Sequence, residues 1–175
     1  MWSSVTIPGS PRILVADATQ NAQGWEHEFA NRLYRSLQKT GLQMVGSVPL
    51  FLNESEDLNA LQSEFNCLLL FTHSDFLREQ QELPSCLLAV CATESVDPKI
   101  SELLLKSNPP VVPFAIVPQS EMTAREAGLF YLKFFTELQL HSKDSISGKM
   151  VWFSFSKARE LLKRRRYHAK FSVRC

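Results

Sequence analysis

The sequence lacks the features that mark membrane-spanning and exported proteins. Its apolar runs, such as Cys67–Phe71 and Cys86–Ala92, are strand-length, far short of the roughly 20 residues that a membrane-spanning helix needs. The N-terminal residues show neither the charged start nor the long apolar core of a signal peptide. These absences predict a cytoplasmic protein with no membrane partner.

Cysteine and glycine are also scarce. The four cysteines, Cys67, Cys86, Cys91 and Cys175, are too few for the disulfide framework of a small secreted domain. Cys86 and Cys91 have no second cysteine or histidine pair at the spacing of a zinc site. The six glycines occur singly, so no glycine-rich phosphate-binding loop is present. We therefore expect neither a metal site nor a cofactor.

The composition is that of a single globular domain, but its charge is uneven. Hydrophobic residues make up 45% and charged residues 21% of the 175 positions, which is ordinary globular usage. Residues 157–175 contain eight basic residues and one acidic residue, whereas the first 156 contain 11 basic and 17 acidic residues. The basic run at 163–166 indicates a solvated helix end or a docking surface. With an acidic remainder, it argues against a dedicated nucleic-acid binder.

Short apolar runs alternate along the chain with amphipathic stretches. The predicted strands cover residues 13–16, 44–48, 67–71, 86–91, 111–117 (irregular at Pro113) and, at an edge, 171–173. The predicted helices cover residues 25–39, 54–63, 98–106, 123–138 and 150–165, with one or two helical turns over 76–82. This alternation predicts a three-layer α/β fold, in which helices cover both faces of a mostly parallel sheet.

Two residues with the right chemistry end consecutive predicted central strands. The carboxyl ends of parallel strands meet at one sheet edge, where functional residues gather. If the strands are neighbours, about 4.8 Å apart, His73 and Cys91 lie at the same edge. A histidine near its neutral-pH titration range can take the proton from a cysteine nucleophile. The spacing therefore predicts a candidate Cys–His dyad.

These residues also have plain structural interpretations. A lone cysteine is often a small buried hydrophobic residue, and Cys67 and Cys86, at the opposite strand ends, are predicted to be core. His73 alone could be an ordinary histidine at a strand end. Asp17, which ends the first predicted strand, could close a loop turn or cap a helix.

Several segments around the pair share their order with a known family. The chain has a helix and then a strand over 56–73, Leu-Ala-Val-Cys-Ala-Thr at 88–93, and a strand, proline-containing loop and aromatic-rich helix over 111–135. Ala158-Arg159 follows in the last predicted helix. Together these segments resemble the CHAT group of caspase-like proteins, within the caspase–separase–gingipain class, over residues 12–162.

The resemblance implies a caspase-like CHAT domain over residues 12–166, with an N-terminal extension (1–11) and a basic C-terminal tail (167–175). It implies a cysteine endopeptidase in which His73 is the base and Cys91 the nucleophile. Backbone N–H groups near Ser74 and Cys91 would form the oxyanion hole. Asp17 is a candidate substrate-binding residue, and its carboxylate would favour Lys or Arg in the substrate. The partner would be a protein substrate or a regulatory protein, and assembly into an oligomer stays open.

The sequence also departs from the family pattern. Ser74 stands where the family commonly has glycine, Ala92 where it has glutamate, and only 17 residues separate His73 from Cys91. The alternative is therefore a catalytically inactive caspase-like interaction or signalling module. A phosphoacceptor receiver needs a cluster of carboxylates, with the phosphoacceptor aspartate at the end of the third strand. Here Asp75 lies just beyond His73, and no adjacent acidic pair follows the first strand, so this fold lacks support. A Toll/interleukin-receptor-like module shares the predicted topology, but no residue pattern favours it.

Overall fold

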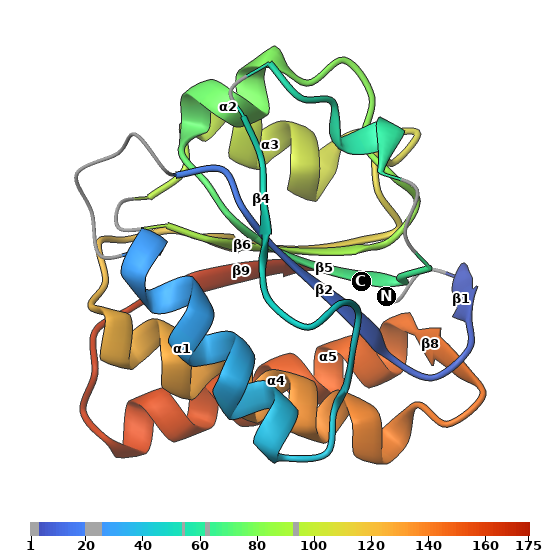
Figure 1. The fold of residues 1–175 in the computed structure, drawn as a ribbon. Coiled ribbons are helices and arrows are strands. Elements are labelled where there is room, and N and C mark those ends of the chain that lie inside the picture. The colour runs from blue at the N-terminus through green and yellow to red at the C-terminus, as the bar shows by residue number, and fades with distance from the viewer. Residues whose placement is uncertain (1–3, 20–25, 54, 62–63, 93–94) are drawn as a thin grey trace.

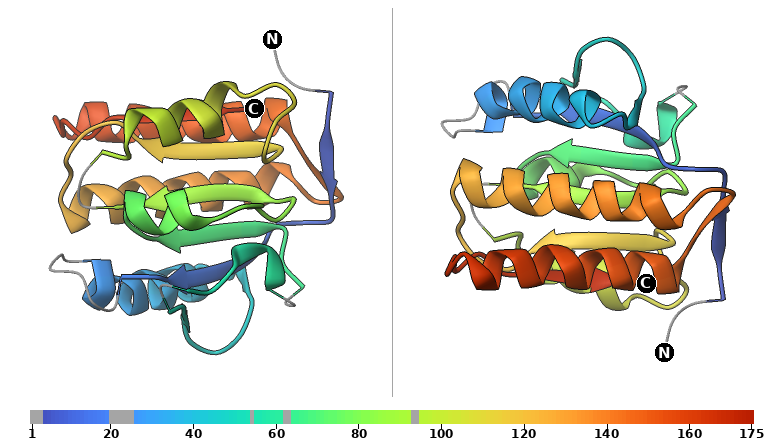
Figure 2. Two further views of the ribbon diagram at one scale, coloured as in Figure 1. Left: turned by 90° about the horizontal axis from the view of Figure 1, so that it is seen from above. Right: turned by 90° about the horizontal axis from the view of Figure 1, so that it is seen from below.

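The computed structural model describes residues 4–19, 26–53, 55–61, 64–92 and 95–175. A seven-stranded sheet lies between two layers of helices, as Figures 1 and 2 show. The predicted three-layer α/β class with a mostly parallel sheet is confirmed.

The main sheet is parallel except at one edge. Across the sheet the strands are β3 (Gln43–Met44), β2 (Arg12–Asp17), β5 (Cys67–Phe71), β6 (Leu87–Cys91), β7 (Phe114–Pro118) and β9 (Phe171–Arg174), and β4 (Leu50–Phe51) also pairs with β2. Only β9 runs antiparallel to its neighbour. Every residue of β5, β6 and β7 is buried, as expected for strands covered on both faces.

The two helical layers create two separate cores. One face is covered by α1 (Glu26–Lys39), α4 (Ala124–His141) and α5 (Gly148–Arg164), and the other by α2 (Ser74–Glu79), α3 (Pro98–Lys106) and the 3₁₀ turn η1 (Leu58–Ala60). Successive strand residues alternate between these cores because side chains of a strand point to opposite faces. Among the described residues, we find no helix with the length and apolarity needed to traverse a lipid bilayer.

The predicted helix over 54–63 is wrong for the residues that the structure describes. Residues 54, 62 and 63 lie outside them, and the rest form only η1. The Asp57 side chain accepts a hydrogen bond from the Asn59 N–H, and the Leu58 N–H donates to Oε1 of Gln80 at 2.8 Å. A tertiary partner thus takes a donor near the start of η1, and the chain turns away after one turn.

Other predicted boundaries shift by a few residues. The strand predicted over 44–48 is replaced by the two short strands β3 and β4, which pair with successive parts of β2. Pro113 precedes β7 instead of interrupting it. Trp25, the predicted first residue of the first helix, lies outside the described residues.

Both ends of the chain contain strands that pair with other parts of the fold. Near the N-terminus, β1 (Thr6–Pro8) pairs antiparallel with β8 (Ser145–Ser147), two short strands without a sequence signal. At the C-terminus, β9 pairs with β7, and the ring of Phe171 stacks on Phe130 of α4 with 3.8 Å between centroids. The segments predicted as an extension and a tail therefore contribute to the two sheets.

The carboxylate of Glu126 ties the C-terminal segment to α4. It completes a capping box with Thr123 and accepts the backbone N–H groups of His168 at 3.2 Å and Ala169 at 2.8 Å. Burial by itself raises the pKa of Glu126, but these hydrogen bonds outweigh burial and lower the pKa below its usual range. The ionised carboxylate thus holds the approach to β9 in place.

We expect Glu126→Gln to lower the free energy of unfolding by about 2 kcal/mol at neutral pH, because charge-assisted hydrogen bonds to partly buried N–H groups are lost. The folded-state pKa is depressed, so this stabilisation is present above the ordinary glutamate pKa and disappears as pH falls through the folded value. Urea unfolding at several pH values measures it. Exposed Glu121→Gln is the control, and an equal effect of both variants would contradict the assignment.

Helix α5 ends in a Schellman turn built without glycine. The Tyr167 N–H donates to the Leu162 carbonyl and the Arg166 N–H to the Lys163 carbonyl, both at 3.0 Å. Arg166 itself has a φ of 59°, in the left-handed region that glycine occupies without a Cβ clash. This turn directs the chain back toward β9.

Arg166→Gly should raise the free energy of unfolding by about 0.5 to 1 kcal/mol, because relief of left-handed strain outweighs the added entropy of the unfolded chain. Chemical denaturation provides the measurement. Arg165→Gly removes the same charge at a position with φ of −82° and should not stabilise. Stabilisation by both variants would point to charge instead of backbone strain.

Candidate functional site

The structure brings the ends of the two predicted site strands together. β5 and β6 are parallel neighbours in which Phe71 lies opposite Cys91. The Thr72 N–H donates to the Cys91 carbonyl at 3.1 Å, and His73 follows directly. His73 and Cys91 therefore meet the first requirement of a dyad, since their backbones lie at the same sheet edge with no strand between them.

The Cys91 side chain points into the protein core. It has no exposed surface, and it belongs to the apolar cluster beneath α1, α4 and α5 together with Leu87 and Ala89. Leu87, Ala89 and Cys91 are every second residue of β6, so all three side chains face the same core. The thiol is not accessible to a substrate in this arrangement.

Tyr131 of α4 closes the core next to this cysteine. Its hydroxyl donates to the Val90 carbonyl, and its ring is completely buried. Burial raises the pKa of Tyr131 well above its ordinary value, and the nearby Cys91 raises it further. Tyr131 thus stays protonated at neutral pH and covers β6 beside Cys91 as a hydrogen-bonded core residue.

A hollow of about 270 Å³ lies at the same sheet edge. It is lined by His73, Ser74, Asp75, Ala92, Ser95 and Val96, without Cys91. His73 precedes α2 and is partly buried, and its Nε2 has no solvent contact and no hydrogen-bond partner among the described residues. The histidine of the predicted dyad therefore lines the hollow, and the cysteine does not. Thr93 of the cysteine motif lies outside the described residues.

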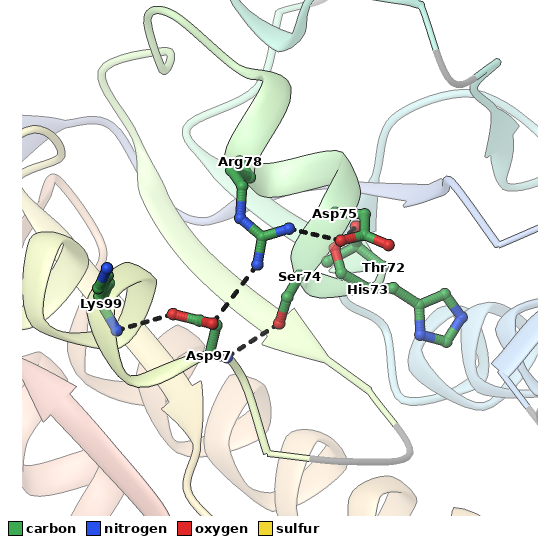
Figure 3. Close-up of polar contacts among 7 residues, drawn as sticks. All are labelled: Thr72, His73, Ser74, Asp75, Arg78, Asp97 and Lys99. Carbon is green, nitrogen blue, oxygen red and sulfur yellow. Dashed lines mark hydrogen bonds and ion pairs between the residues drawn. The ribbon is translucent and has the colours of Figure 1, made fainter.

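Ser74 is the first residue of α2, so its backbone is helical. It does not adopt the left-handed conformation that a glycine at this position would make easy. Its hydroxyl accepts the Asp97 N–H at 2.9 Å (Figure 3). Figure 3 also shows the His73 ring pointing away from this link. The side chain of Ser74 thus joins α2 to the start of α3.

The same link includes an ion-pair network that the sequence analysis missed. Asp97 caps α3 by accepting the Lys99 N–H at 2.9 Å, and Arg78 contacts both Asp75 at 2.6 Å and Asp97 at 3.4 Å. The Asp-Pro pair at 97–98, a helix-start signature, indicated the cap. Nothing in the spacing indicated that Ser74 and Arg78 would meet it.

Asp17 ends β2 one strand away, opposite Phe71. Its carboxylate is completely buried and accepts both the backbone N–H of Thr19, at 2.8 Å, and the Thr19 hydroxyl. This is the loop-turn role that the sequence left open for this residue. Its assignment to a substrate pocket stays a prediction, and the two hydrogen bonds already use its Oδ1.

The other cysteines do not add to the site. Cys67 and Cys86 are buried as predicted, and burial raises the pKa of Cys86 to about 12. Cys175 is partly exposed at the end of the chain. No group of three or more histidine, cysteine, aspartate or glutamate residues in the described part of the chain has the geometry to hold a metal ion.

Comparison with known proteins adds no relative. No protein-family model matches the chain, and no curated protein sequence matches it significantly. The residues and their geometry are therefore the basis for a functional proposal.

Asp17→Ala should lower the free energy of unfolding by about 2 kcal/mol, because the buried Thr19 N–H and hydroxyl lose their acceptor. Asp17→Asn keeps an oxygen acceptor, so we expect a smaller loss. Thermal and urea unfolding give both values. The control is Asp75→Ala, which removes an exposed ion pair worth about 0 to 1 kcal/mol. A loss no larger than that of the control would rule out the structural role.

Proposed function

We propose that the chain is a caspase-like α/β domain that acts as a protein-interaction module and has no peptidase activity of its own. The observation that carries this proposal is the complete burial of Cys91 beneath α4. The caspase-like identity is part of the proposal and is supported by the order of the sequence motifs and by the adjacent histidine and cysteine strands.

A cysteine nucleophile has two geometric requirements. Its sulfur must reach a substrate carbonyl at about 3 to 3.5 Å, and it must lie within hydrogen-bond reach of the base that activates it. A side chain with no exposed surface, outside the hollow that His73 lines, does not meet the first requirement. Cys91 is placed as a core residue instead.

The departures from the family pattern agree with this proposal. Ser74 begins a helix and binds the Asp97 N–H, and Ala92 provides only a small apolar wall to the hollow. The Ser74–Asp97–Arg78 network links α2 to the start of α3 at the strand-end region. These polar groups are used for contacts within the fold, which suits a recognition surface better than a site for substrate turnover.

A second candidate is the cysteine peptidase that the resemblance implies. One observation favours it: the Nε2 of His73 is buried without a partner in the described part of the chain, beside the strand that ends in Cys91. A buried polar nitrogen without a hydrogen bond is unfavourable. It would be explained if the imidazole faced the thiol in another arrangement of this edge.

Thiol labelling distinguishes the two candidates. In the native protein we expect Cys175 to react with iodoacetamide faster than the three buried cysteines. Partial burial raises the pKa of Cys175, so it should react more slowly than a fully exposed cysteine. Cys67, Cys86 and Cys91 should react only through local or global opening. Mass spectrometry of the labelled peptides gives each rate, and Cys175→Ser is the control that removes the fast phase.

A peptide-library cleavage assay completes the comparison. The proposal expects no cleavage by wild type above the level of Cys91→Ala, and a decrease in unfolding free energy of about 1 to 2 kcal/mol for Cys91→Ala from lost packing. Rapid labelling of Cys91 with cleavage that Cys91→Ala and His73→Ala both abolish would establish the peptidase instead.

A further inference from the structure

The charges of this chain are separated into two segments. Residues 53–83 contain seven acidic residues and one basic residue, and residues 157–175 contain eight basic residues and one acidic residue. The remaining residues carry ten of each sign. The acidic excess of the first 156 residues therefore comes entirely from one segment of 31 positions.

The fold places the helical parts of these segments on opposite faces of the sheet. The acidic segment supplies η1 and α2 on one face, whereas the basic segment supplies most of the second half of α5 on the other. Figure 1 shows α2 and α3 above the sheet and α4 and α5 below it. Each molecule thus carries an acidic side and a basic side.

The basic side also exposes aromatic rings. Its outer face on α5, which we call the aromatic-basic face, consists of Lys149, Trp152, Phe153, Lys157, Arg159 and Lys163. Trp152 is 38% and Phe153 41% exposed. Arg159 lies 5.8 Å from the ring of Trp152 and Lys157 lies 5.4 Å from that of Phe153. Aromatic and arginine side chains in this combination are typical of the centres of protein interfaces.

The one acidic residue of the basic segment is already engaged. Glu160 accepts a hydrogen bond from Arg164 at 2.8 Å. Arg164 therefore compensates it within the helix, and the aromatic-basic face keeps its positive charge. An anionic partner with an apolar depression would complement this face.

The acidic side has such a depression. A groove of about 730 Å³ lies between α2 and α3, which we call the α2–α3 groove, and its apolar lining is Leu77, Leu83, Ile100, Leu103, Leu104 and Val111. Glu82 also lines the groove, and Glu56, Asp57 and Glu79 line an adjoining hollow. We call these four residues the acidic border. Leu103 is 51% exposed.

The rim cation Arg78 is already paired. It contacts Asp75 and Asp97. Besides Arg78, the described residues that line the groove include one more cation, Lys99. The acidic border beside the groove therefore keeps most of its negative charge.

We propose that the aromatic-basic face of one copy binds the α2–α3 groove and its acidic border on a second copy. Trp152 and Phe153 would enter the apolar groove, and Lys157 and Arg159 would lie against Glu79 and Glu82. The two surfaces differ, so the contact is heterologous and repeats head to tail. This names the partner of the interaction module proposed above, and it rests on that proposal.

A second copy fits these surfaces better than other anionic partners. A basic face with aromatic rings would by itself also suit an anionic membrane or a nucleic acid. Neither of those explains why the same molecule presents an acidic border around an apolar groove on its other side. Self-association uses both surfaces at once.

Sedimentation velocity of the full chain at two salt concentrations tests the proposal. At about 0.01 M salt, where charges act over about 30 Å, the average mass should exceed the 19.9 kDa of the monomer and rise with protein concentration. At about 1 M salt it should fall toward the monomer. A monomer at both salt concentrations overturns self-association and leaves the Cys91 labelling result, which tests the proposed function, unaffected.

Charge-reversal pairs identify the surfaces. Lys157→Glu/Arg159→Glu and Glu79→Lys/Glu82→Lys should each be monomeric alone, and mixing them should restore association because each supplies the surface that the other lacks. Arg32→Glu/Arg35→Glu, on exposed positions of α1, changes the net charge as the first pair does and should associate like wild type. Equal dissociation by this control, or no recovery on mixing folded variants, overturns the assignment.

The apolar contact has its own test. Trp152→Ala should weaken self-association about tenfold or more, as truncation of a buried interface anchor does. Val48→Ala, at a position 59% exposed and outside both surfaces, should leave it unchanged. Thermal unfolding confirms that each variant is folded. Association unaffected by Trp152→Ala would contradict the insertion of the rings into the groove.

Discussion

The burial of the central strands on both faces decides most of this structure. Every residue of β5 and β6 is enclosed between the two helical layers, so their side chains alternate strictly between two cores. Cys91 has the same parity as Leu87 and Ala89 and enters the core beneath α4, although it is the last residue of its strand. The edge hollow is then formed by residues that follow the strands. It is lined by His73 and Ser74, and not by Cys91.

The same enclosure explains how the chain's ends are used. β7 needs a neighbour on its open side, and β9 supplies it as an antiparallel strand. The chain reaches that position through the left-handed turn at Arg166 and the carboxylate of Glu126, and the stacking of Phe171 on Phe130 holds it there. The basic residues of α5 lie on the outside, so the charge of the second half of this helix becomes a surface property of one face.

These features fit a domain that works by contact. The predicted dyad residues share a sheet edge, but one is a core residue and the other lines a hollow without it. The surface, in contrast, is strongly differentiated, with exposed rings among cations on one side and an apolar groove beside carboxylates on the other. Packing and charge therefore both favour the two helical faces, and not the sheet edge, as the surfaces that would bind a partner.

Continuous apolar runs such as 67–71 predicted the central strands, and the spacing of apolar residues predicted α4, because burial leaves a direct pattern in composition. The strands β1 and β8 could not be predicted, since three residues carry no periodicity. In place of the helix expected over 54–63, the Leu58 N–H donates to the side chain of Gln80, a distant residue. The sequence alone also predicted that His73 and Cys91 follow or end consecutive strands, and it determined how many charges each segment carries. Only the tertiary structure decided that the thiol faces the core and that the opposite charges occupy opposite faces. The direction of a side chain and the location of a charge depend on which elements pack around them.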